Sequence, residues 1–529
     1  MIQEENHMNI EEQKNFKQPP QSYWMASTPQ TEYPTLNEDL KVDIAIIGGG
    51  ITGISCACML NKEGLKIAII EADRIVQGTT GNTTAKITSQ HGLIYSKIKG
   101  QMSEEFAKQY ADANESAIRM IEKIAEDHQI ECDYISQSSY IYTLQSEYID
   151  KISEEARVAS SLGIKATFLE DIPLSFPVKA AVRFDNQAQF HPRKFLLPLA
   201  KDFSNSGGNI FENSRVVDIE ENEGGYVITT NQGKKVTAKK LIIASHYPCL
   251  NKAGLYFSRI YEERSYVVAI KAREDYPGGM YIAAEEHGHS LRNQMSESGE
   301  MILVGGEQHK TGQGKDTSEN YKALIDFSNE NFTVEDIPYR WSTQDCMTLD
   351  GLPFAGHFTS KTPNMFIATG YGKWGMTNSI ASAMILRDLI INGKSPWQDV
   401  YNPSRQTITA SAKNFVVQSV NVAENLIGGK ITSLPEQVEV KPGEGKIIES
   451  NGERAGAYRD EQGALHVVDT TCTHLGCEAN WNSAEKSWDC PCHGSRFSVE
   501  GDVIEGPAVK PLDFNKDVNI IARLINDRF

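Results

Sequence analysis

Four cysteines and two histidines crowd into two short segments near the end of the chain, and this cluster constrains the fold more than any other feature. The segments read CTHLGC over 472–477 and CPCHGS over 490–495. Each segment offers a thiolate and an imidazole close together, Cys472 with His474 and Cys490 with His493. Two sulfur and two nitrogen ligands are typical of a metal centre. The sequence therefore predicts two loops that a small domain holds face to face.

This ligand set suits a [2Fe–2S] centre in which two cysteines bind one iron and two histidines bind the other. Because neutral imidazoles replace two thiolates, such a cluster carries less negative charge and is easier to reduce. Zinc also binds cysteine and histidine, but its sites usually pair cysteines as C-x2–4-C, whereas the close pairs here are C-x-H and C-x2-H. A third interpretation is that the four cysteines form two disulfides and that the histidines are bystanders. Ligand type and spacing together favour the iron–sulfur interpretation.

A second constraint lies near the start of the chain, where a buried strand is expected to end in glycines. The run VDIAIIGGG starts at Val42, helical spacing follows over 51–60, and the apolar run KIAIIEA spans 66–72. This order predicts a parallel strand, a helix and a second parallel strand.

Three glycines between the first strand and the helix fit the pattern G-x-G-x-x-G. Gly48 permits the tight turn, Gly50 lets a pyrophosphate approach the backbone, and Gly53 allows close packing of helix on strand. The helix start offers free N–H groups to phosphates. Glu71 closes the second strand, where a carboxylate would accept hydrogen bonds from ribose hydroxyls. The motif predicts a dinucleotide site without distinguishing FAD from NAD.

Composition narrows the classes of function. A chain of 529 residues suggests two to four domains, and its net charge of −18 argues against nucleic acid or an anionic membrane as a partner. We find no secretory signal and no apolar run of spanning length, so we expect a soluble cytoplasmic protein with no membrane span. The other five cysteines are expected to be buried apolar residues: Cys56, Cys58, Cys132, Cys249 and Cys346.

The two C-terminal boxes resemble the signature of the Rieske family. By that resemblance Cys472 and Cys490 would bind one iron, and His474 and His493 the other. The remaining pair, one cysteine from each loop, would clamp the loops together as a disulfide, Cys477 with Cys492. The segment GPAVKP at 506–511 resembles the proline loop that covers the cluster in such domains.

Four further segments resemble the D-amino-acid-oxidase family of flavoproteins, which includes sarcosine and glycine oxidases. They are GTTGNTTAKITSQHG over 78–92, DNQAQFHPRKFL over 185–196, IIASHYP over 242–248 and ATGYGKWGMTNS over 368–379. The resemblance, from about 43 to 390, implies noncovalent FAD. In the family's pattern the FAD contacts would be Thr83, Thr84 and Ala85 along the pyrophosphate and ribityl chain, Val217 at the adenine, and Gly375, Met376 and Thr377 at the flavin pyrimidine edge.

One alternative concerns a second nucleotide. Gly370, Gly372 and Gly375 also spell G-x-G-x-x-G after an expected strand. A separate NAD site is therefore conceivable, but no acidic residue ends a following strand at the usual distance.

These observations together predict an α/β FAD-binding Rossmann-like domain interleaved with an α+β antiparallel-sheet substrate domain, followed by a small all-β Rieske domain. We expect an N-terminal arm at 1–40, the oxidoreductase domain at 41–395, a helical connector at 396–433 and the Rieske domain at 434–529. The FAD part would take about 41–98, 186–250 and 345–395, and the substrate part about 99–185 and 251–344. The connector helix is expected to stop at Gly428 and Gly429.

The flavoprotein resemblance implies that a small amine or amino-acid-like substrate transfers a hydride to FAD. Such chemistry needs alignment and desolvation more than a strong acid or base, so no residue is required to stand out as catalytic. Weak candidates are Lys373 in the turn near the flavin, and His309, Lys310 and Arg292 as binders of a carboxylate. For each of them, the simpler interpretation as a surface charge or structural residue is preferred.

The two sites together predict a dehydrogenase whose cluster passes single electrons to an external carrier protein or quinone. In the alternatives, the cluster delivers electrons to the flavin, acts as a redox sensor, or is a structural element of an amine oxidase. A Rieske oxygenase would need a mononuclear iron held by two histidines and a carboxylate, and no H-x4-H with a nearby acid is present.

We predict a cluster potential below that of the high-potential Rieske proteins. In those proteins a serine and a tyrosine hydroxyl donate hydrogen bonds to the cluster sulfurs, and such bonds raise the potential. Here Ser495 is present, but Phe497 stands where the tyrosine is expected. A potentiometric titration followed by electron paramagnetic resonance measures this directly, and a respiratory-type potential would contradict the prediction.

Overall fold

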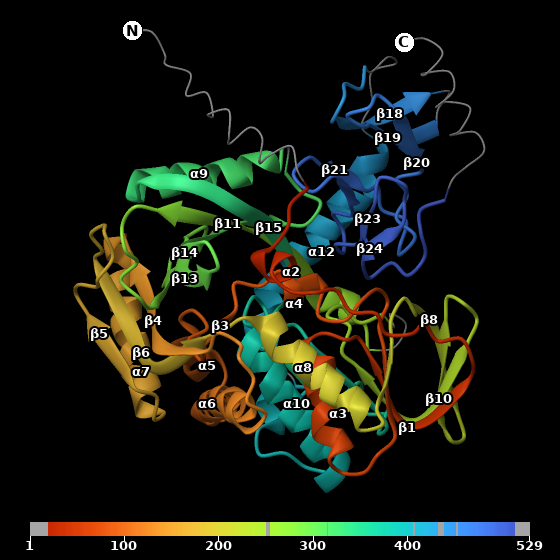
Figure 1. Cartoon of the computed structure of the whole chain (residues 1–529), viewed down its shortest axis with the longest axis horizontal. Helices are drawn as coiled ribbons and strands as arrows, with labels where there is room; N and C mark the ends of the chain where they lie inside the picture. Colours follow the sequence, from red (N-terminus) through yellow and green to blue (C-terminus); the bar gives the residue numbers. More distant parts are fainter. Residues whose placement is uncertain are drawn as a thin grey trace.

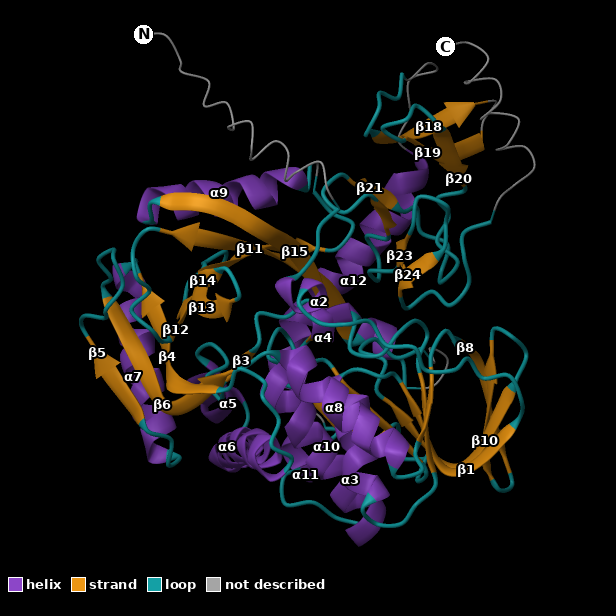
Figure 2. Cartoon of the chain, in the orientation of Figure 1, coloured by secondary structure: helices purple, strands orange, loops and turns teal. Residues whose placement is uncertain are grey.

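Two large sheets and a small β-rich unit make up the chain (Figures 1 and 2). The computed structural model describes residues 19–249, 254–314, 316–405, 408–431, 439–450 and 453–513. The first sheet is mostly parallel, the second mostly antiparallel, and the small unit forms the C-terminal part. The fold class expected from the sequence is confirmed.

The mostly parallel sheet has the order β16-β17-β10-β1-β2-β7, and the hairpin β8–β9 pairs with β10. Its central strands β1 and β10 end in apolar runs, 45–47 and 241–243, because both faces of the sheet are buried there. Helices α3, α8 and α10 pack together beside it. The bounds are β1 Leu40–Ile47, β2 Ile67–Ile70, β7 Asn209–Phe211, β8 Val216–Asn222, β9 Gly225–Thr230, β10 Lys235–Ile243, β16 Phe354–His357, β17 Met365–Thr369, α3 Ile51–Asn61, α8 Pro192–Asn205 and α10 Gly375–Asn392.

The second sheet has the order β15-β11-β14-β13-β12-β4-β6-β3, with β5 paired to β6. Helix α9 packs on β11 and β14, and α7 packs on β5 and β6. Strand β3 comes from a segment that we assigned to the FAD part, yet it pairs with β6. The strands are β3 Lys86–Ile87, β4 Ile135–Thr143, β5 Ala166–Leu169, β6 Ala180–Gln189, β11 Ile260–Ala272, β12 Met280–Ala283, β13 Ser290–Ser296, β14 Gly299–Lys310 and β15 Val334–Thr348; the helices are α7 Ile149–Ser161 and α9 Ser318–Asn331.

The helical spacing beyond residue 95 corresponds to two helices, α5 (Ile94–Gln101) and α6 (Glu104–Asp127). They are separated because Ser103 caps α6, its side chain accepting a hydrogen bond from the Phe106 N–H. Shorter helices and turns complete the flavoprotein part: α2 Tyr23–Ala26, α4 Gly78–Gly81, α11 Gln398–Tyr401, and the 3-10 turns Ser146–Tyr148 and Tyr256–Ser258.

The described part of the N-terminal arm packs into the protein. Trp24 of α2 is fully buried, and its indole N–H donates to the Thr83 carbonyl at 2.6 Å. The Ser22 hydroxyl donates to the Gly81 carbonyl. The arm thereby supports the loop that carries the expected FAD contacts.

The connector is helix α12, Ile408–Ile431. It continues through Gly428 and Gly429, so the expected stop at these glycines is wrong. Each glycine costs about 1 kcal/mol relative to alanine, but the helix hydrogen bonds can continue through it.

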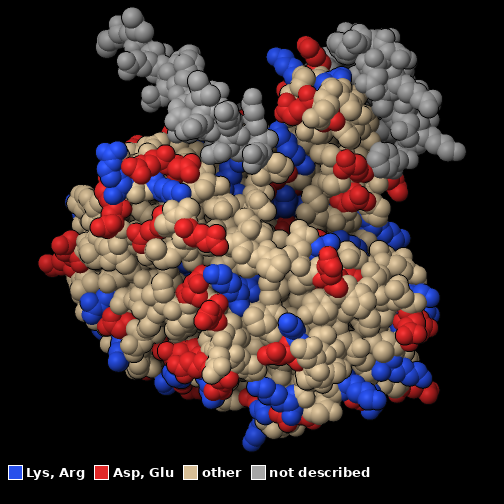
Figure 3. Space-filling model, viewed as in Figure 1, with Lys and Arg blue, Asp and Glu red and all other residues tan. Residues whose placement is uncertain are grey.

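The C-terminal unit follows as two small sheets, β18-β19-β20 and β21-β22-β23-β24 (Figure 1). Its strands are β18 Gly445–Ser450, β19 Glu453–Arg459, β20 Leu465–Val468, β21 Asn480–Asn482, β22 Ser487–Asp489, β23 Arg496–Phe497 and β24 Val503–Glu505. None of the helices in the described ranges is long and apolar enough to cross a membrane. On the face drawn in Figure 3, acidic and basic side chains are interspersed.

The packing of α3 on β1 generates a prediction. A Cβ atom at Gly53 would lie 1.9 Å from the Gly48 carbonyl oxygen, so Gly53→Ala must push the helix from the strand. We expect a loss of about 1–3 kcal/mol of stability and a lower FAD content. Thermal unfolding and flavin absorbance measure both.

The matched control is Gly100→Ala in α5, where an added Cβ meets nothing within 4 Å. This substitution should leave flavin content unchanged and stability equal or slightly higher. Equal effects of the two substitutions would show that the close approach at Gly53 is unimportant.

Candidate functional site

The two cysteine–histidine loops are each closed by their own backbone. The Cys472 N–H donates to the Cys477 carbonyl at 2.8 Å, and the Cys490 N–H donates to the Ser495 carbonyl at 2.8 Å. Both loops turn through a glycine with positive φ, Gly476 at 79° and Gly494 at 73°. Strands β20 to β23 flank the loops and so fix them in one small domain.

The side chains of the four expected ligands converge. The thiols of Cys472 and Cys490 are buried and within hydrogen-bond distance of each other. The rings of His474 and His493 lie edge to face with centroids 5.0 Å apart. Both ring nitrogens of His474 and Nδ1 of His493 are buried with no hydrogen-bond partner among the described residues. Because unpaired buried polar atoms are costly, this donor set fits a [2Fe–2S] cluster.

The protonation states suit metal ligands. Burial lowers the pKa of His474 to about 4, and burial lowers the pKa of His493 to about 3. Both imidazoles are therefore neutral at pH 7, the form that offers a lone pair to iron. The hydrogen bond from Cys490 lowers the pKa of the Cys472 thiol to about 7, which favours one thiolate even before iron binds.

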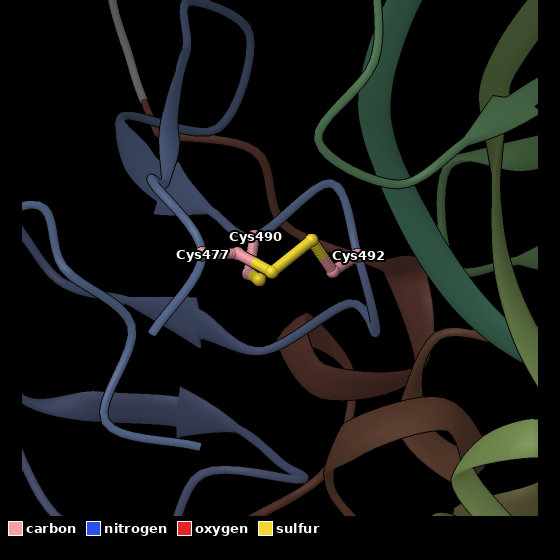
Figure 4. A group of neighbouring side chains, drawn as sticks. All are labelled: Cys477, Cys490 and Cys492. Atoms are coloured by element: carbon pink, nitrogen blue, oxygen red, sulfur yellow. A yellow bond between two sulfur atoms is a disulfide. The ribbon is translucent and has the colours of Figure 1, made fainter. Parts of the chain in front are cut away.

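The other two cysteines of the loops form a disulfide, Cys477–Cys492, with an S–S distance of 2.07 Å (Figure 4). The sulfur of Cys490 lies beside it, and the three sulfurs are within 4.8 Å of one another. Two of the three are consumed by the disulfide, so this trio is not a ligand set. Since Cys472 and Cys490 are free, the interpretation with two disulfides is wrong.

A cavity of about 380 Å³ lies between the two large sheets. The glycine loop after β1 forms one wall, where Gly48 has a φ of 106° and a Cβ there would lie 2.5 Å from the Ala244 carbonyl oxygen. The N-cap residue of α3, Gly50, has no side chain to cap the helix, and the Ile51 N–H donates to the Thr80 hydroxyl at 3.2 Å. The bare backbone at the helix start fits a pyrophosphate.

Glu71 holds this loop in place. Its carboxylate accepts hydrogen bonds from the Gly49 N–H at 2.7 Å and the Asp73 N–H at 3.0 Å, and it lines the cavity. Burial raises the pKa of Glu71. Its remaining lone pairs fit the ribose hydroxyls expected from the sequence.

Most of the expected FAD contacts line this one cavity: Gly48, Gly50, Glu71, Thr83, Thr84, Gly375 and Met376. Four others do not: Gly53, Ala85, Val217 and Thr377. Val216 lines the cavity in place of Val217, next to a register shift in the hairpin. The Thr377 hydroxyl donates to the Thr88 carbonyl at 2.9 Å. The second glycine triad shares this cavity through Gly375, so it marks no separate NAD cavity.

The weak catalytic candidates have structural partners. Lys373 lines the cavity but forms an ion pair with Glu263 at 2.8 Å. Arg292 is fully buried and donates to the Thr84 and Ala85 carbonyls at 3.1 and 3.0 Å.

His309 and Lys310 lie outside this cavity's lining. His309 bonds Tyr266 at 3.0 Å and the Lys310 carbonyl at 2.9 Å. The Lys310 ammonium donates to Gln418 and Asn421 of α12, at 2.6 and 2.5 Å. Neither side chain is placed to bind a substrate in the cavity.

The cluster domain contributes to the same cavity. Part of the lining comes from the end of β24, Ile504 and Glu505, and from the expected proline loop, Gly506, Pro507, Ala508 and Val509. Ser495 supports that loop, because its hydroxyl accepts from the Ala508 N–H at 3.0 Å. The loop that is bonded to the second cysteine–histidine loop therefore also lines the dinucleotide cavity.

Direct contacts fix this arrangement. The Gln344 amide donates to the Gly494 carbonyl at 2.9 Å, between the expected cluster ligand His493 and Ser495. Arg264 pairs with Glu505 at 3.3 Å. The turn after β14 packs on the start of the same cluster loop, since a Cβ at Gly312 would lie 2.6 Å from the Pro491 nitrogen.

Three side chains of the site were missed in the sequence. Lys86 and Tyr247 line the cavity inside quoted segments, and Gln344 lines it while reaching the cluster loop. Only for Lys86 was a signal present, a lysine two positions after the Thr83–Thr84 pair that is expected along the FAD. Tyr247 and Gln344 acquire their place only through contacts between domains.

Comparisons with known proteins agree with this geometry. Residues 43–389 match the family "FAD dependent oxidoreductase", and residues 431–519 match "Rieske [2Fe-2S] domain". The putative Rieske 2Fe-2S iron-sulfur protein YhfW of Bacillus subtilis is 42% identical over 94% of this chain and 97% of its own.

More distant relatives cover the flavoprotein part. Gamma-glutamylputrescine oxidoreductase of Escherichia coli is 22% identical over 70% of this chain and 88% of its own. The crystal structure of glycine oxidase from Geobacillus kaustophilus has a TM-score of 0.59 at 18% identity, covering 69% of this chain and 99% of that one. The chain belongs to the FAD dependent oxidoreductase family and carries a C-terminal Rieske [2Fe-2S] domain, with FAD and a [2Fe–2S] cluster as its cofactors.

Proposed function

We propose that the protein oxidises the C–N bond of a small amine or amino-acid-like substrate and passes the electrons through its Rieske domain to an external acceptor. When bound, FAD supplies hydride acceptance and the cluster supplies one-electron transfer. The proposal rests on one observation: Gly48 of the flavoprotein part and Pro507 of the C-terminal domain line the same cavity.

The residues between the two sites support an internal electron path. Tyr247 lines the cavity and is buried, and its pKa is raised well above the usual value by burial, with smaller contributions from Glu262, Cys346 and Cys490. Gln344 lines the cavity and bonds the loop residue Gly494. A short packed path of this kind favours transfer within the chain over transfer between separate proteins.

The substrate class is inferred from the relatives. Their names include an oxidoreductase of gamma-glutamylputrescine and an oxidase of glycine, both carrying the amine next to an oxidisable carbon. The antiparallel-sheet wall of the cavity offers small side chains and bare backbone there, including Ser265, Ser290 and Gly305. Such a wall suits a small substrate that is desolvated on binding.

The electron exit is assigned to the other face of the cluster loops. Leu475, next to the ligand His474, is 52% exposed, whereas His493 is buried and its ring lies 6.1 Å from that of Phe257. We assign the Leu475 face to a protein carrier or a quinone, because both present apolar surface around a redox centre.

The experiment is anaerobic mixing of the full-length holoprotein with glycine, gamma-glutamylputrescine and pools of secondary amines. Visible absorption follows the flavin, and electron paramagnetic resonance follows the reduced cluster. Flavin bleaching followed by a Rieske signal is the expected result. If both centres are loaded and neither responds, the amine assignment fails or the electrons run in the opposite direction.

A variant of the cluster separates the alternatives. In His474→Ala, loss of the electron exit should slow steady-state turnover with an external acceptor. A simple amine oxidase with a structural cluster would make hydrogen peroxide at an unchanged rate. A redox sensor would show no useful rate of flavin reduction in the unaltered protein either.

Docking of the cluster loop gives a further prediction. Gly312→Ala places a Cβ 2.7 Å from the Cys490 carbonyl carbon and should push the cluster loop away from the flavoprotein part. We expect the rate of electron transfer from flavin to cluster to fall by at least about tenfold, because small displacements of reacting groups are costly. Freeze-quench spectroscopy after substrate mixing measures it.

The control is Gly314→Ala in the same turn. Gly314 also has a positive φ, 114°, so alanine strains the backbone at both positions, but its added Cβ meets nothing within 4 Å. Flavin and cluster content should remain normal in both variants. Equal transfer rates in the two variants would mean that this contact does not govern the path.

A further inference from the structure

Lys86 occupies an unusual place on the antiparallel-sheet side of the cavity. It is the first residue of β3, directly after Ala85 and the two threonines expected along the FAD, and it lines the cavity. Its ammonium nitrogen contacts two hydroxyls, Thr84 Oγ1 at 3.1 Å and Ser290 Oγ at 3.2 Å. Two neutral acceptors hold the side chain in position while its remaining hydrogen-bonding capacity faces the cavity.

The charges around Lys86 do not favour an ammonium ion. No described carboxylate forms an ion pair with it, whereas Lys373, on the same cavity, pairs with Glu263. From β13 the Arg292 guanidinium adds a repelling positive charge, and from the partner strand β6 the residue opposite is the neutral Gln189. Burial, with a smaller contribution from Arg292, lowers the pKa of Lys86 to about 7.

We propose that Lys86 is a catalytic residue of this cavity, whose amine takes the proton that an ammonium substrate must lose before its C–N bond is oxidised. The inference rests on the amine oxidation proposed above. An ammonium has no lone pair to support departure of a hydride from the adjacent carbon, so the substrate must react as the neutral amine. Small amines are almost fully protonated at pH 7, so a base inside the cavity is needed to convert the bound ammonium to the neutral amine.

The step is a proton transfer without oxidation or reduction. One N–H bond of the substrate ammonium breaks, one N–H bond forms at Lys86 Nζ, and the substrate nitrogen keeps the electron pair. The Thr84 and Ser290 hydroxyls accept hydrogen bonds from the resulting ammonium. Lys86 returns its proton to water when the product leaves and the cavity opens to solvent.

The first test measures Lys86 without turnover. The full-length holoprotein is labelled with trace acetic anhydride between pH 5 and 11, and peptide mass spectrometry follows Lys86 and the exposed Lys41. We expect half-maximal reactivity of Lys86 near pH 7, far below the value of about 10.4 for an ordinary exposed lysine side chain. A Lys86 profile that follows Lys41 would overturn the proposal, because a permanently charged lysine accepts no proton.

The second test uses two variants that differ in one property. Lys86→Arg keeps a positive charge but cannot deprotonate, and Lys86→Met removes the charge and the base. In both we expect anaerobic flavin reduction by glycine or gamma-glutamylputrescine to slow by about 10²–10³-fold at pH 7.5. In both, the rate should then rise tenfold per pH unit, whereas the unaltered protein should be flat above about pH 7.

The outcomes are distinct. If Lys86→Arg keeps the rate and Lys86→Met loses it, the residue anchors an anionic group and is not a base. If the Lys86→Met profile equals that of the unaltered protein, Lys86 has no part in the reaction. Failure of the proposed function would instead leave the flavin of the unaltered protein oxidised with every amine, and the acetylation profile would still decide whether Lys86 is neutral.

Discussion

The seating of the C-terminal domain over the dinucleotide cavity is the contact on which the functional geometry depends. The cavity wall from Ile504 to Val509 belongs to the C-terminal domain, so the flavoprotein part alone leaves its cavity open on that side. Glycines make the close approach possible. Gly494 of the cluster loop packs so tightly that a Cβ would lie 2.7 Å from the Glu262 side chain. Neither domain forms the complete site alone.

Buried charges fix the register of this contact. Arg264 of β11 and Arg496 of β23 both contact Glu505, and Arg496 also pairs with Asp489, which precedes the expected ligand Cys490. Buried ion pairs of this kind add little net stability, because desolvation offsets their attraction. They do penalise any other seating, in which one of these charges would be buried without a partner. The network therefore accounts for a single orientation of the C-terminal domain on the flavoprotein part, and not for a large free energy of association between them.

The sequence predicted those parts of the protein whose chemistry is local. The cluster loops, the strand–glycine–helix unit around Gly48 and the two-domain flavoprotein class follow from short motifs, each with a spacing that the backbone imposes. The connector helix was also visible from its periodicity. Its end was not, because Gly428 and Gly429 continue the helix instead of stopping it.

The sequence could not predict contacts between segments far apart in the chain. The packing of Trp24 against Thr83 and the bond from Gln344 to Gly494 depend on tertiary structure that no local pattern encodes. The same limit applies to Arg292. In sequence it suggests a carboxylate binder, but in the structure its guanidinium donates to backbone carbonyls of the cofactor loop. That use has a consequence for Lys86. A guanidinium held in place by carbonyls stays charged, and its fixed positive charge adds to the effect of burial in favouring a neutral amine on Lys86, so the structural role of one residue contributes to the chemistry available to the other.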